Sequence, residues 1–176
     1  MRLICAQLAL CIGAATPPTA TEPYVLPPNS PVLDLGEGNV RILADKAATG
    51  GTWATLERTE PPGTRTSLHR HNRMDEAFYV VSGTFSVYLG GRLRALGPGA
   101  FVFIPRGTPH AQGNASSRTV KLLSFFSPAG WEQSARDRAA LHSQYPAGTK
   151  AFADRIGRVF EKHDIEVLGP SPIPRR

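Results

Sequence analysis

The sequence predicts an all-β protein, a sandwich or barrel of short strands, with helices after it. Between Val40 and Phe126, short runs rich in β-branched and aromatic residues alternate with glycine and proline turn signals. After Pro128 the spacing of hydrophobic residues changes from strand-like to helix-like. With 176 residues, the chain has room for one such domain with a substantial core, but not for two large ones.

Composition and charge exclude several classes of protein. Hydrophobic residues make up 41% and charged residues 19%, which is ordinary for a globular domain. The net charge is +6, but the basic residues are spread along the chain without a dense block, so we expect a solvated basic surface and no nucleic-acid partner. No apolar stretch approaches the ~18–20 residues that a spanning helix needs, so no membrane partner is expected.

The first residues resemble a secretory signal. A basic residue, Arg2, precedes a short apolar run and the small residues 13–15. Residues 1–20 are therefore predicted to be a signal peptide, and the mature chain would be secreted or periplasmic. A frayed N-terminal arm or a misplaced start codon is the alternative, in which case the protein would be cytoplasmic. Both cysteines, Cys5 and Cys11, lie in this segment, so cleavage would leave no disulfide.

The next segments are a proline-rich arm at 21–37 and a barrel at 38–127. The prolines hold the arm extended and without regular hydrogen bonding. Within the barrel, the runs 76–81 and 100–104 are apolar at both odd and even positions, which indicates strands covered on both faces. One face would look into the barrel. The other would be covered by the arm, by a C-terminal helix or by a second subunit, and we therefore expect a homodimer.

Residues 128–176 are predicted to form a helical extension and tail. A first helix is expected over about 131–141, and a last strand over 165–168. Between them, four apolar residues recur at the spacing of one helical face, and they should pack a helix against the outside of the barrel. These residues are Phe152, Ile156, Val159 and Phe160.

Four residues of the barrel region carry metal-binding chemistry. His69 and His71 are two positions apart, so on a strand they project from the same face and can chelate one ion. The turn after them can return Glu76 beside the pair, which would add a carboxylate oxygen. His110 follows a second turn signal and is the natural fourth ligand. A single histidine in a strand is usually structural, and it is the set of four that indicates a metal site.

The spacing of these residues forms two complete motifs. The first is G-x5-H-x-H-x4-E-x6-G, which ends at Gly83, and the second is G-x5-P-x-G-x2-H-x3-N, which ends at Asn114. Both resemble the motifs of the cupin superfamily, and the resemblance covers about residues 38–127. It implies a double-stranded β-helix, or jelly-roll barrel, with the C-terminal helices packed outside. Metal ligands are implied at His69, His71, Glu76 and His110, and turn positions at Gly63, Gly83, Gly99, Pro105, Gly107 and Asn114.

Three imidazoles and one carboxylate suit one divalent transition metal ion and leave coordination positions open. Nickel, manganese, iron, cobalt and copper are all compatible with this set. Zinc in a closed structural site is the competing interpretation. The ligands alone therefore do not identify the metal.

The segments 75–80 and 126–130 are similar to those of single-domain cupins of the quercetin 2,3-dioxygenase-like group. That resemblance implies a metal-dependent dioxygenase that opens a flavonol, or a related aromatic or enolic compound, with O2 and releases carbon monoxide. Glu76 would then be a catalytic proton acceptor as well as a ligand. A flat aromatic substrate needs an apolar pocket with a few polar groups. The residues expected to line it are Phe78, Val80, Phe101, Phe103 and Gln112.

Two other classes of function fit the same residues. The site could hold a small molecule without turnover, as a binding or sensory cupin. Alternatively, an isomerase, cyclase or lyase could use the metal as a Lewis acid and Glu76 as a base, with no need for oxygen.

Overall fold

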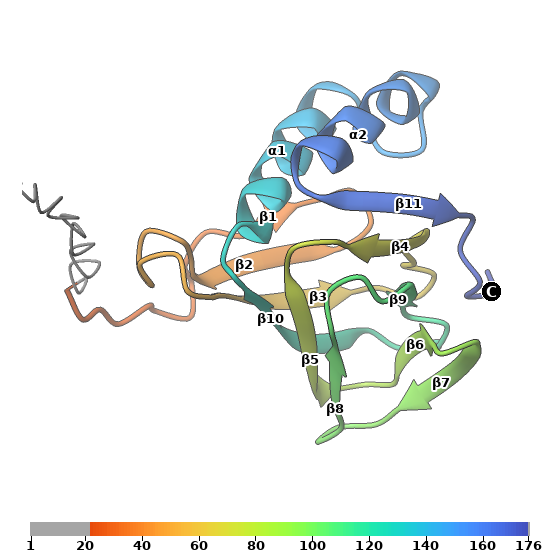
Figure 1. Cartoon of the computed structure of the whole chain (residues 1–176), viewed down its shortest axis with the longest axis horizontal. Helices are drawn as coiled ribbons and strands as arrows, with labels where there is room; N and C mark the ends of the chain where they lie inside the picture. The colour runs from red at the N-terminus through yellow and green to blue at the C-terminus, as the bar shows by residue number, and fades with distance from the viewer. Residues whose placement is uncertain (1–21, 176) are drawn as a thin grey trace, which may run out of the picture.

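The structure, a computed structural model, describes residues 22–175, so the predicted signal peptide at 1–20 lies outside the described residues. The strands and helices follow the order predicted, with strands first and helices near the C-terminus (Figure 1). The strands are β1 Leu33–Asp34, β2 Asn39–Ala44, β3 Ala54–Glu60, β4 Leu68–His71, β5 Asp75–Ser82, β6 Phe85–Leu89, β7 Arg92–Leu96, β8 Phe101–Ile104, β9 His110–Gly113, β10 Val120–Ser127 and β11 Ile165–Gly169. The helices are α1 Trp131–Gln144 and α2 Lys150–Lys162.

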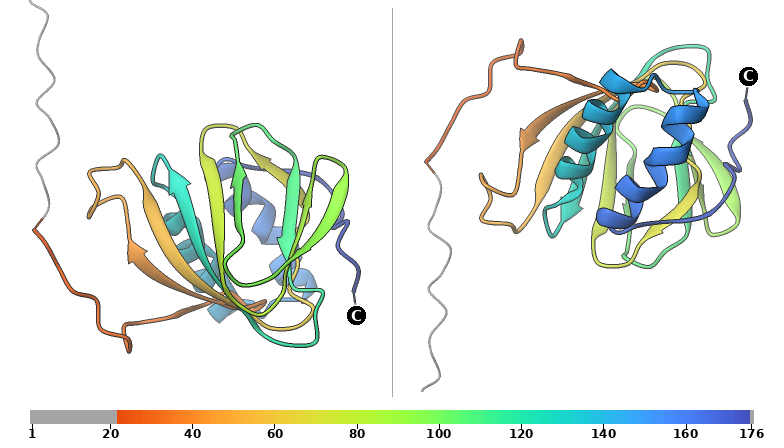
Figure 2. Two further views of the ribbon diagram at one scale, coloured as in Figure 1. Left: turned by 90° about the horizontal axis from the view of Figure 1, so that it is seen from below. Right: turned by 90° about the horizontal axis from the view of Figure 1, so that it is seen from above.

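The strands form two antiparallel sheets that face each other as a jelly-roll barrel (Figure 2). The six-stranded sheet has the order β1-β2-β3-β10-β5-β8, and the five-stranded sheet has the order β11-β4-β9-β6-β7. Neighbouring strands in these orders are often far apart in the sequence, and β10 lies between β3 and β5. The predicted all-β jelly roll with C-terminal helices is confirmed.

The last strand, β11, closes one edge of the smaller sheet. It pairs with β4, so that Ile165 lies opposite His71 and Val167 lies opposite His69. Arg70 and Glu166 join the same two strands by an ion pair of 2.9 Å between Arg70 Nε and Glu166 Oε2. The predicted last strand is thus confirmed, and it supports the strand that carries two of the histidines.

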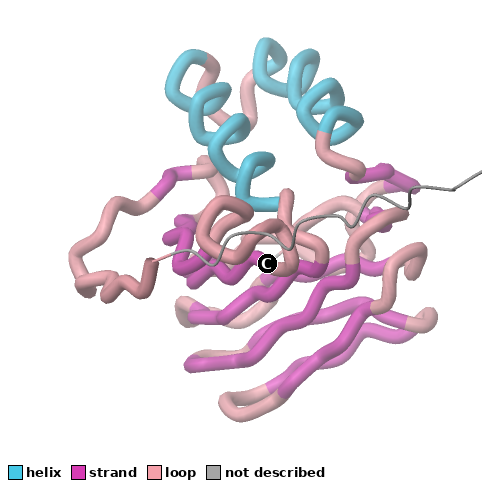
Figure 3. The backbone as a smooth tube through the Cα atoms, turned by 60° about the vertical axis from the view of Figure 1, so that its left-hand side comes forward, coloured by secondary structure: helices cyan, strands magenta, loops and turns pink. Residues whose placement is uncertain are grey.

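Both helices pack on one side of the barrel, α1 against β1 and β3 and α2 against β11 (Figures 1 and 3). Helix α1 begins at Trp131, whose ring stacks on Phe126 with centroids 4.8 Å apart. Helix α2 begins after Thr149, whose side chain accepts a hydrogen bond from the Phe152 amide and so caps the helix. The helical spacing found in the sequence correctly predicted α2, and its Phe160 packs against the core.

The barrel interior holds two hydrophobic clusters. One fills the end of the barrel remote from the helices, and full burial of each large side chain there contributes ~1.5–3 kcal/mol. Its members are Phe78, Val80, Phe85, Val87, Val102, Ile104, Val120 and Leu122. The other cluster joins the barrel to α1 and β11. Its members are Leu35, Val40, Leu56, Met74, Phe126, Trp131, Ala135 and Ile165.

Within residues 22–175, neither the arm nor a C-terminal helix covers the outer face of the runs 76–81 and 100–104, so of the three predicted covers only a second subunit stays open. Phe101 and Phe103 are 60% and 56% exposed on the outer face of β8. Tyr79 and Val81 of β5 are also exposed there. Because these runs are apolar at both odd and even positions, the sequence did not show which face of each strand is outside. Neither helix covers the outer face of β5 and β8. The homodimer stays a prediction.

No helix within residues 22–175 combines the length and the apolar character needed to cross a lipid bilayer.

Candidate metal centre

Strand β4 points His69 and His71 into the barrel. Its side chains alternate between half-buried and buried, and the two histidines are only 6% and 2% exposed. Strand β9 runs antiparallel to β4 with His110 directly opposite His69. Three imidazoles from two neighbouring strands therefore meet on the inner face of the smaller sheet, with ring centroids 4.3–5.7 Å apart.

Glu76 reaches the histidines from the opposite sheet. It is the first inward-pointing residue of β5, and it is 1% exposed. Its neighbour Asp75 faces outward and accepts hydrogen bonds of 2.8 Å from the Arg106 amide and 3.0 Å from Arg106 Nε. The Gly107 amide bonds to the His71 carbonyl at 2.6 Å. These contacts tie the loop before His110 to both β4 and β5, and so they fix the four side chains relative to one another.

The four side chains form one compact cluster. Each offers one ligand atom, and these atoms all lie within 4.8 Å of one another. Glu76 Oε2 is 2.9 Å from His110 Nε2 and 3.4 Å from His71 Nε2. The structure therefore brings together His69, His71, Glu76 and His110, the residues predicted as ligands.

Backbone carbonyl groups orient two of the imidazoles. His69 Nδ1 is 2.9 Å from the Ser67 carbonyl oxygen, and His110 Nδ1 is 2.9 Å from the Thr108 carbonyl oxygen. A carbonyl only accepts, so both Nδ1 atoms carry the hydrogen and both Nε2 atoms face the cluster. Such outer contacts fix the ring orientation and the tautomer of metal-binding histidines.

Burial and mutual contacts shift the pKa values of these groups. Burial, with the nearby His110, lowers the pKa of His69 to about 3, so this imidazole is neutral at pH 7, as metal ligation requires. Burial alone would raise the pKa of Glu76, but its contacts with His110 and His71 outweigh burial and hold the pKa below its usual value. The Glu76 carboxylate in turn raises the pKa of His110 against the effect of burial.

Unpartnered buried atoms show that the cluster fits a metal ion. His71 Nδ1, His71 Nε2 and Glu76 Oε1 are buried without a hydrogen-bond partner, an arrangement that costs stability unless another group binds them. The four residues, all buried, would supply three nitrogen ligands and one oxygen ligand. This set suits a divalent transition metal and leaves coordination positions open, as the sequence indicated.

A cavity of about 190 Å³ lies between this cluster and the helices, and His69 forms part of its wall. Side chains of α2 line one side of it, namely Phe152, Ile156 and Phe160. Arg65 and Ser67 lie on the border between this cavity and a wider surface groove of about 530 Å³. The groove and the cavity therefore adjoin each other.

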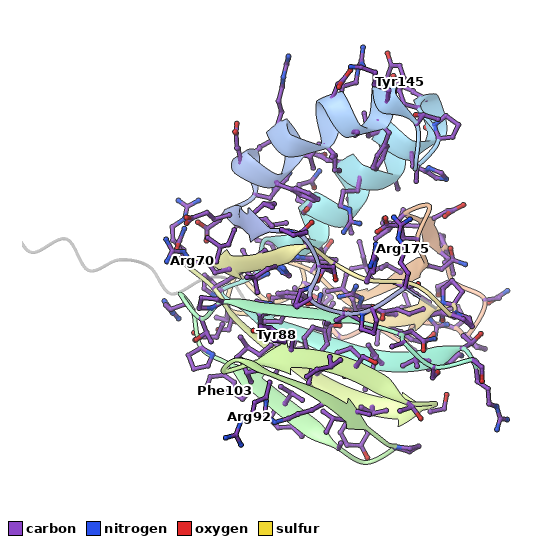
Figure 4. The ribbon with its side chains drawn as sticks, turned by 90° about the vertical axis from the view of Figure 1, so that its right-hand side faces the viewer. Arg70, Tyr88, Arg92, Phe103, Tyr145 and Arg175 are labelled. Carbon is purple, nitrogen blue, oxygen red and sulfur yellow. The ribbon has the colours of Figure 1, made fainter. Side chains whose placement is uncertain are left out.

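The residues predicted to line the pocket have different positions. Gln112 lines the cavity, as expected. Phe78 and Val80 point inward but belong to a hydrophobic cluster and not to the cavity wall, although the Phe78 ring lies 5.9 Å from the guanidinium carbon of Arg58. Phe101 and Phe103 are on the outer face of the barrel, and Figure 4 places Phe103 among the strands, far from Tyr145 at the helical end. The assignment of Phe101 and Phe103 to the pocket is therefore wrong.

Several cavity residues were not predicted. Trp131, the first residue of α1, forms part of the cavity wall. Arg58 and Arg138 line the cavity as well. Arg58 could have been found, because Leu56, Arg58 and Glu60 share one parity on β3, and charged side chains on an otherwise apolar inner face are unusual. Nothing in the sequence indicated that Arg138 of α1 approaches the same point.

The predicted turn residues also have clear structural positions. Gly83 has a φ of 81°, in the left-handed region that favours glycine. Asn114 is fully buried and donates hydrogen bonds to the carbonyl oxygens of Glu60 and Arg118 at 2.9 and 2.8 Å. Gly113 matters for the site. A Cβ at this position would collide with the Thr64 carbonyl oxygen, so only glycine lets the segment that contains Thr64 and Arg65 pair with β9 and bring Arg65 to the mouth of the cavity.

The barrel has the jelly-roll fold of cupins, and the four-residue cluster lies inside it. A family profile described as "Cupin domain" matches residues 56–126, which contain all four clustered residues.

Among curated proteins, the chain is similar to a quercetin 2,3-dioxygenase of Bacillus subtilis, with 27% identity over 164 residues. The match includes 87% of this chain but only 46% of that protein. A mannose-1-phosphate guanylyltransferase of Escherichia coli matches at 28% identity over 65% of this chain and 21% of its own length. The chain thus spans at most about half the length of these two relatives.

Among solved structures, KdgF from Halomonas superposes with a TM-score of 0.57 at 24% identity, over 64% of this chain and 99% of that chain. An RmlC-like cupin from Shewanella frigidimarina superposes with a TM-score of 0.55 at 22% identity, over 64% of this chain and 96% of that chain. At these identities the two structures show a shared fold.

Proposed function

We propose that the protein is a metal-dependent dioxygenase that acts on a small enolic or aromatic compound. The observation that carries the proposal is the match to a quercetin 2,3-dioxygenase, which extends over 87% of this chain and so includes the four clustered residues. The buried cluster of three histidines and one glutamate supports it, because this ligand set leaves positions open for small molecules.

The protein's own residues would have the following roles. His69, His71, His110 and Glu76 would hold the metal, which would supply Lewis acidity and redox chemistry when bound. Glu76 Oε1 has no hydrogen-bond partner, so it is the atom able to accept the hydroxyl proton of an enolic substrate. Trp131 and α2 cover the cavity and limit the access of bulk water to it.

Oxygen uptake tests the proposal. The full chain would be purified without chelators, analysed for metals by mass spectrometry, and reconstituted in turn with nickel, manganese, iron, cobalt, copper and zinc. We expect about one metal per chain and oxygen consumption with a flavonol or a smaller enol. Glu76→Gln should lower turnover by about 100-fold or more while the fold is kept. Glu161→Gln, an exposed change on α2, is the matched control.

Two outcomes would replace the proposal with the other functions considered. Conversion of substrate that continues without oxygen would indicate an isomerase, cyclase or lyase. Tight binding with no product would indicate a binding or sensory cupin.

A further inference from the structure

Metal binding does not explain why two arginines, Arg58 and Arg138, lie in the cavity wall. Arg58 of β3 is 5% exposed, and its Nε and Nη1 atoms are buried without a hydrogen-bond partner. Arg138 of α1 lines the same cavity, and its Nε is also buried and unpartnered. Gln112, beside them in the cavity wall, has an unpartnered Oε1. Buried guanidinium donors without acceptors cost stability unless a ligand supplies the missing acceptors.

The surrounding aromatic rings hold both guanidinium groups in place. The Arg58 guanidinium carbon lies 5.5 Å from the ring centroid of Trp131 and 5.9 Å from that of Phe78. The Arg138 guanidinium carbon lies 5.7 Å from the ring centroid of Phe160. Groups fixed in this way lose little freedom when they bind an anion, which favours binding.

Acidic groups lie near the two arginines but leave several of their donors free. Glu60 Oε1 is 2.8 Å from Arg58 Nη2, and burial raises the pKa of the Glu60 carboxyl group. Burial and the charge of Arg58 lower the pKa of Arg138 to about 10, so it remains protonated at pH 7. Glu37 also lines the cavity, and its charge, like that of Glu60, raises the pKa of Arg138. The Nε and Nη1 donors of Arg58 and the Nε donor of Arg138 nevertheless have no acceptor.

The opposite wall of the cavity is apolar, since it is formed by Phe152, Ile156 and Phe160 of α2. The volume of about 190 Å³ is below the ~300–1,000 Å³ of sites for drug-sized ligands. A small molecule with one negative charge and a flat apolar body would complement both walls.

We propose that the substrate of this site carries a carboxylate, which Arg58 and Arg138 bind, while its apolar body packs against α2 and faces His69. A carboxylate fits better than a phosphate, because it brings less negative charge close to Glu37 and Glu60, and because its planar group matches the guanidinium fork. This inference names the substrate class of the proposed oxygenase, and it rests on the cavity being its substrate site.

Binding of benzoate and of benzamide, measured by calorimetry on the full chain, tests the inference. The two probes have the same shape, but only benzoate is charged at pH 7. We expect benzoate to bind about 10-fold more tightly or better, since hydrogen bonds to charged groups are stronger than neutral ones. Arg138→Met keeps the apolar stem over Phe160 and should remove the preference. Arg158→Met, an exposed change on α2, should leave it intact.

A second variant and a second condition complete the test. Arg58→Lys keeps the charge beside Glu60, so the fold should survive, but it removes the planar fork and should weaken benzoate binding without affecting benzamide. The preference should also persist after metal removal. Equal binding of both probes would overturn the inference, and so would a preference that disappears with the metal, because the carboxylate would then bind the ion. Tighter binding of inorganic phosphate than of benzoate would overturn it as well. None of these readouts depends on oxygen uptake, so this inference and the proposed function can fail separately.

Discussion

The two ends of the barrel are built on the same strands but differ in chemistry. On β5, Glu76 belongs to the metal cluster, whereas Phe78, two positions further, lies in a purely hydrophobic cluster. On β3, which runs parallel to β5, the inward row changes in the opposite direction, from Leu56 to Arg58 and Glu60, so that Arg58 lies level with Val80. Arg58 and the metal cluster nevertheless both border the cavity beneath the helices. The apolar end is closed by its own side chains. The polar end is instead covered by the helices and contains several buried atoms without partners.

This difference separates stability from function within one core. Hydrophobic packing gains free energy from every buried side chain, whereas buried charged groups cost free energy unless they are paired or bind a ligand. The apolar end should therefore account for most of the stability of the barrel. The polar end should become favourable when a metal ion and an anionic ligand complete it.

Truncation at the apolar end should have the largest effect. Phe78 is fully buried, and Phe78→Ala should lower the free energy of unfolding by about 3–5 kcal/mol in a denaturant titration. Phe101→Ala removes the same side chain where it is 60% exposed, and it should change stability by less than about 0.5 kcal/mol. A comparable loss from both variants would mean that Phe101 is covered in solution and that the comparison fails.

Replacement of the buried ion pair should have the opposite sign. The double variant Arg58→Met with Glu60→Leu removes two buried charges together, so the free energy of unfolding should stay unchanged or rise by up to about 4 kcal/mol. The same variant should lose the preference for benzoate. Glu60→Leu alone leaves Arg58 without its partner and should destabilise the protein, which serves as the control. A large loss of stability in the double variant would show that the pair stabilises the barrel.

Metal binding should stabilise the polar end. At a free metal concentration about 100 times the Kd, a metal that binds only the folded state adds about 2.7 kcal/mol to the free energy of unfolding. His69→Ala should abolish this gain in thermal unfolding with and without metal. His142→Ala is the control, because that histidine lies on α1 near Asp34 and outside the cluster. A gain that survives in His69→Ala would place the ion elsewhere.

The contact between the two helices should make the smallest contribution. Hydrogen bonds from Lys162 and His163 hold the pKa of Asp137 well below its usual value. A lowered folded-state pKa stabilises the protein above the unfolded-state value of about 3.9, and this contribution is lost as the pH falls toward the folded-state value. Asp137→Asn should therefore cost less than about 1 kcal/mol at pH 7.

The difference between wild type and Asp137→Asn, measured by denaturant titration, should shrink as the pH drops below about 4. Asp154→Asn alters an exposed ion pair within α2 alone and should show no comparable loss. A difference that stays constant down to low pH would mean that the charge of Asp137 does not stabilise the helix contact.

Only part of the metal cluster was predictable from local sequence. His69 and His71 share a strand face by their spacing, and a single turn separates them from Glu76. His110 lies 34 residues after Glu76, and it was predicted from a turn signal and from the resemblance of its motif to that of cupins. The positions of Phe101 and Phe103 were not predictable, since a strand that is apolar at both parities does not reveal its inner face. The pairing of β11 with β4 depends on contacts between residues about a hundred positions apart in the chain, which no local pattern encodes. The approach of Arg138 to Arg58 likewise depends on how α1 packs.

The pairing of β11 with β4 has a consequence for synthesis. During translation, all four residues of the metal cluster emerge from the ribosome well before Ile165–Gly169. Until then β4 has β9 as its only neighbour in the sheet, and one edge of the strand that carries His69 and His71 is open. The nascent protein therefore completes the support of its metal ligands only after Gly169 has been added. A nascent chain arrested before residue 165 should bind metal more weakly than the released protein.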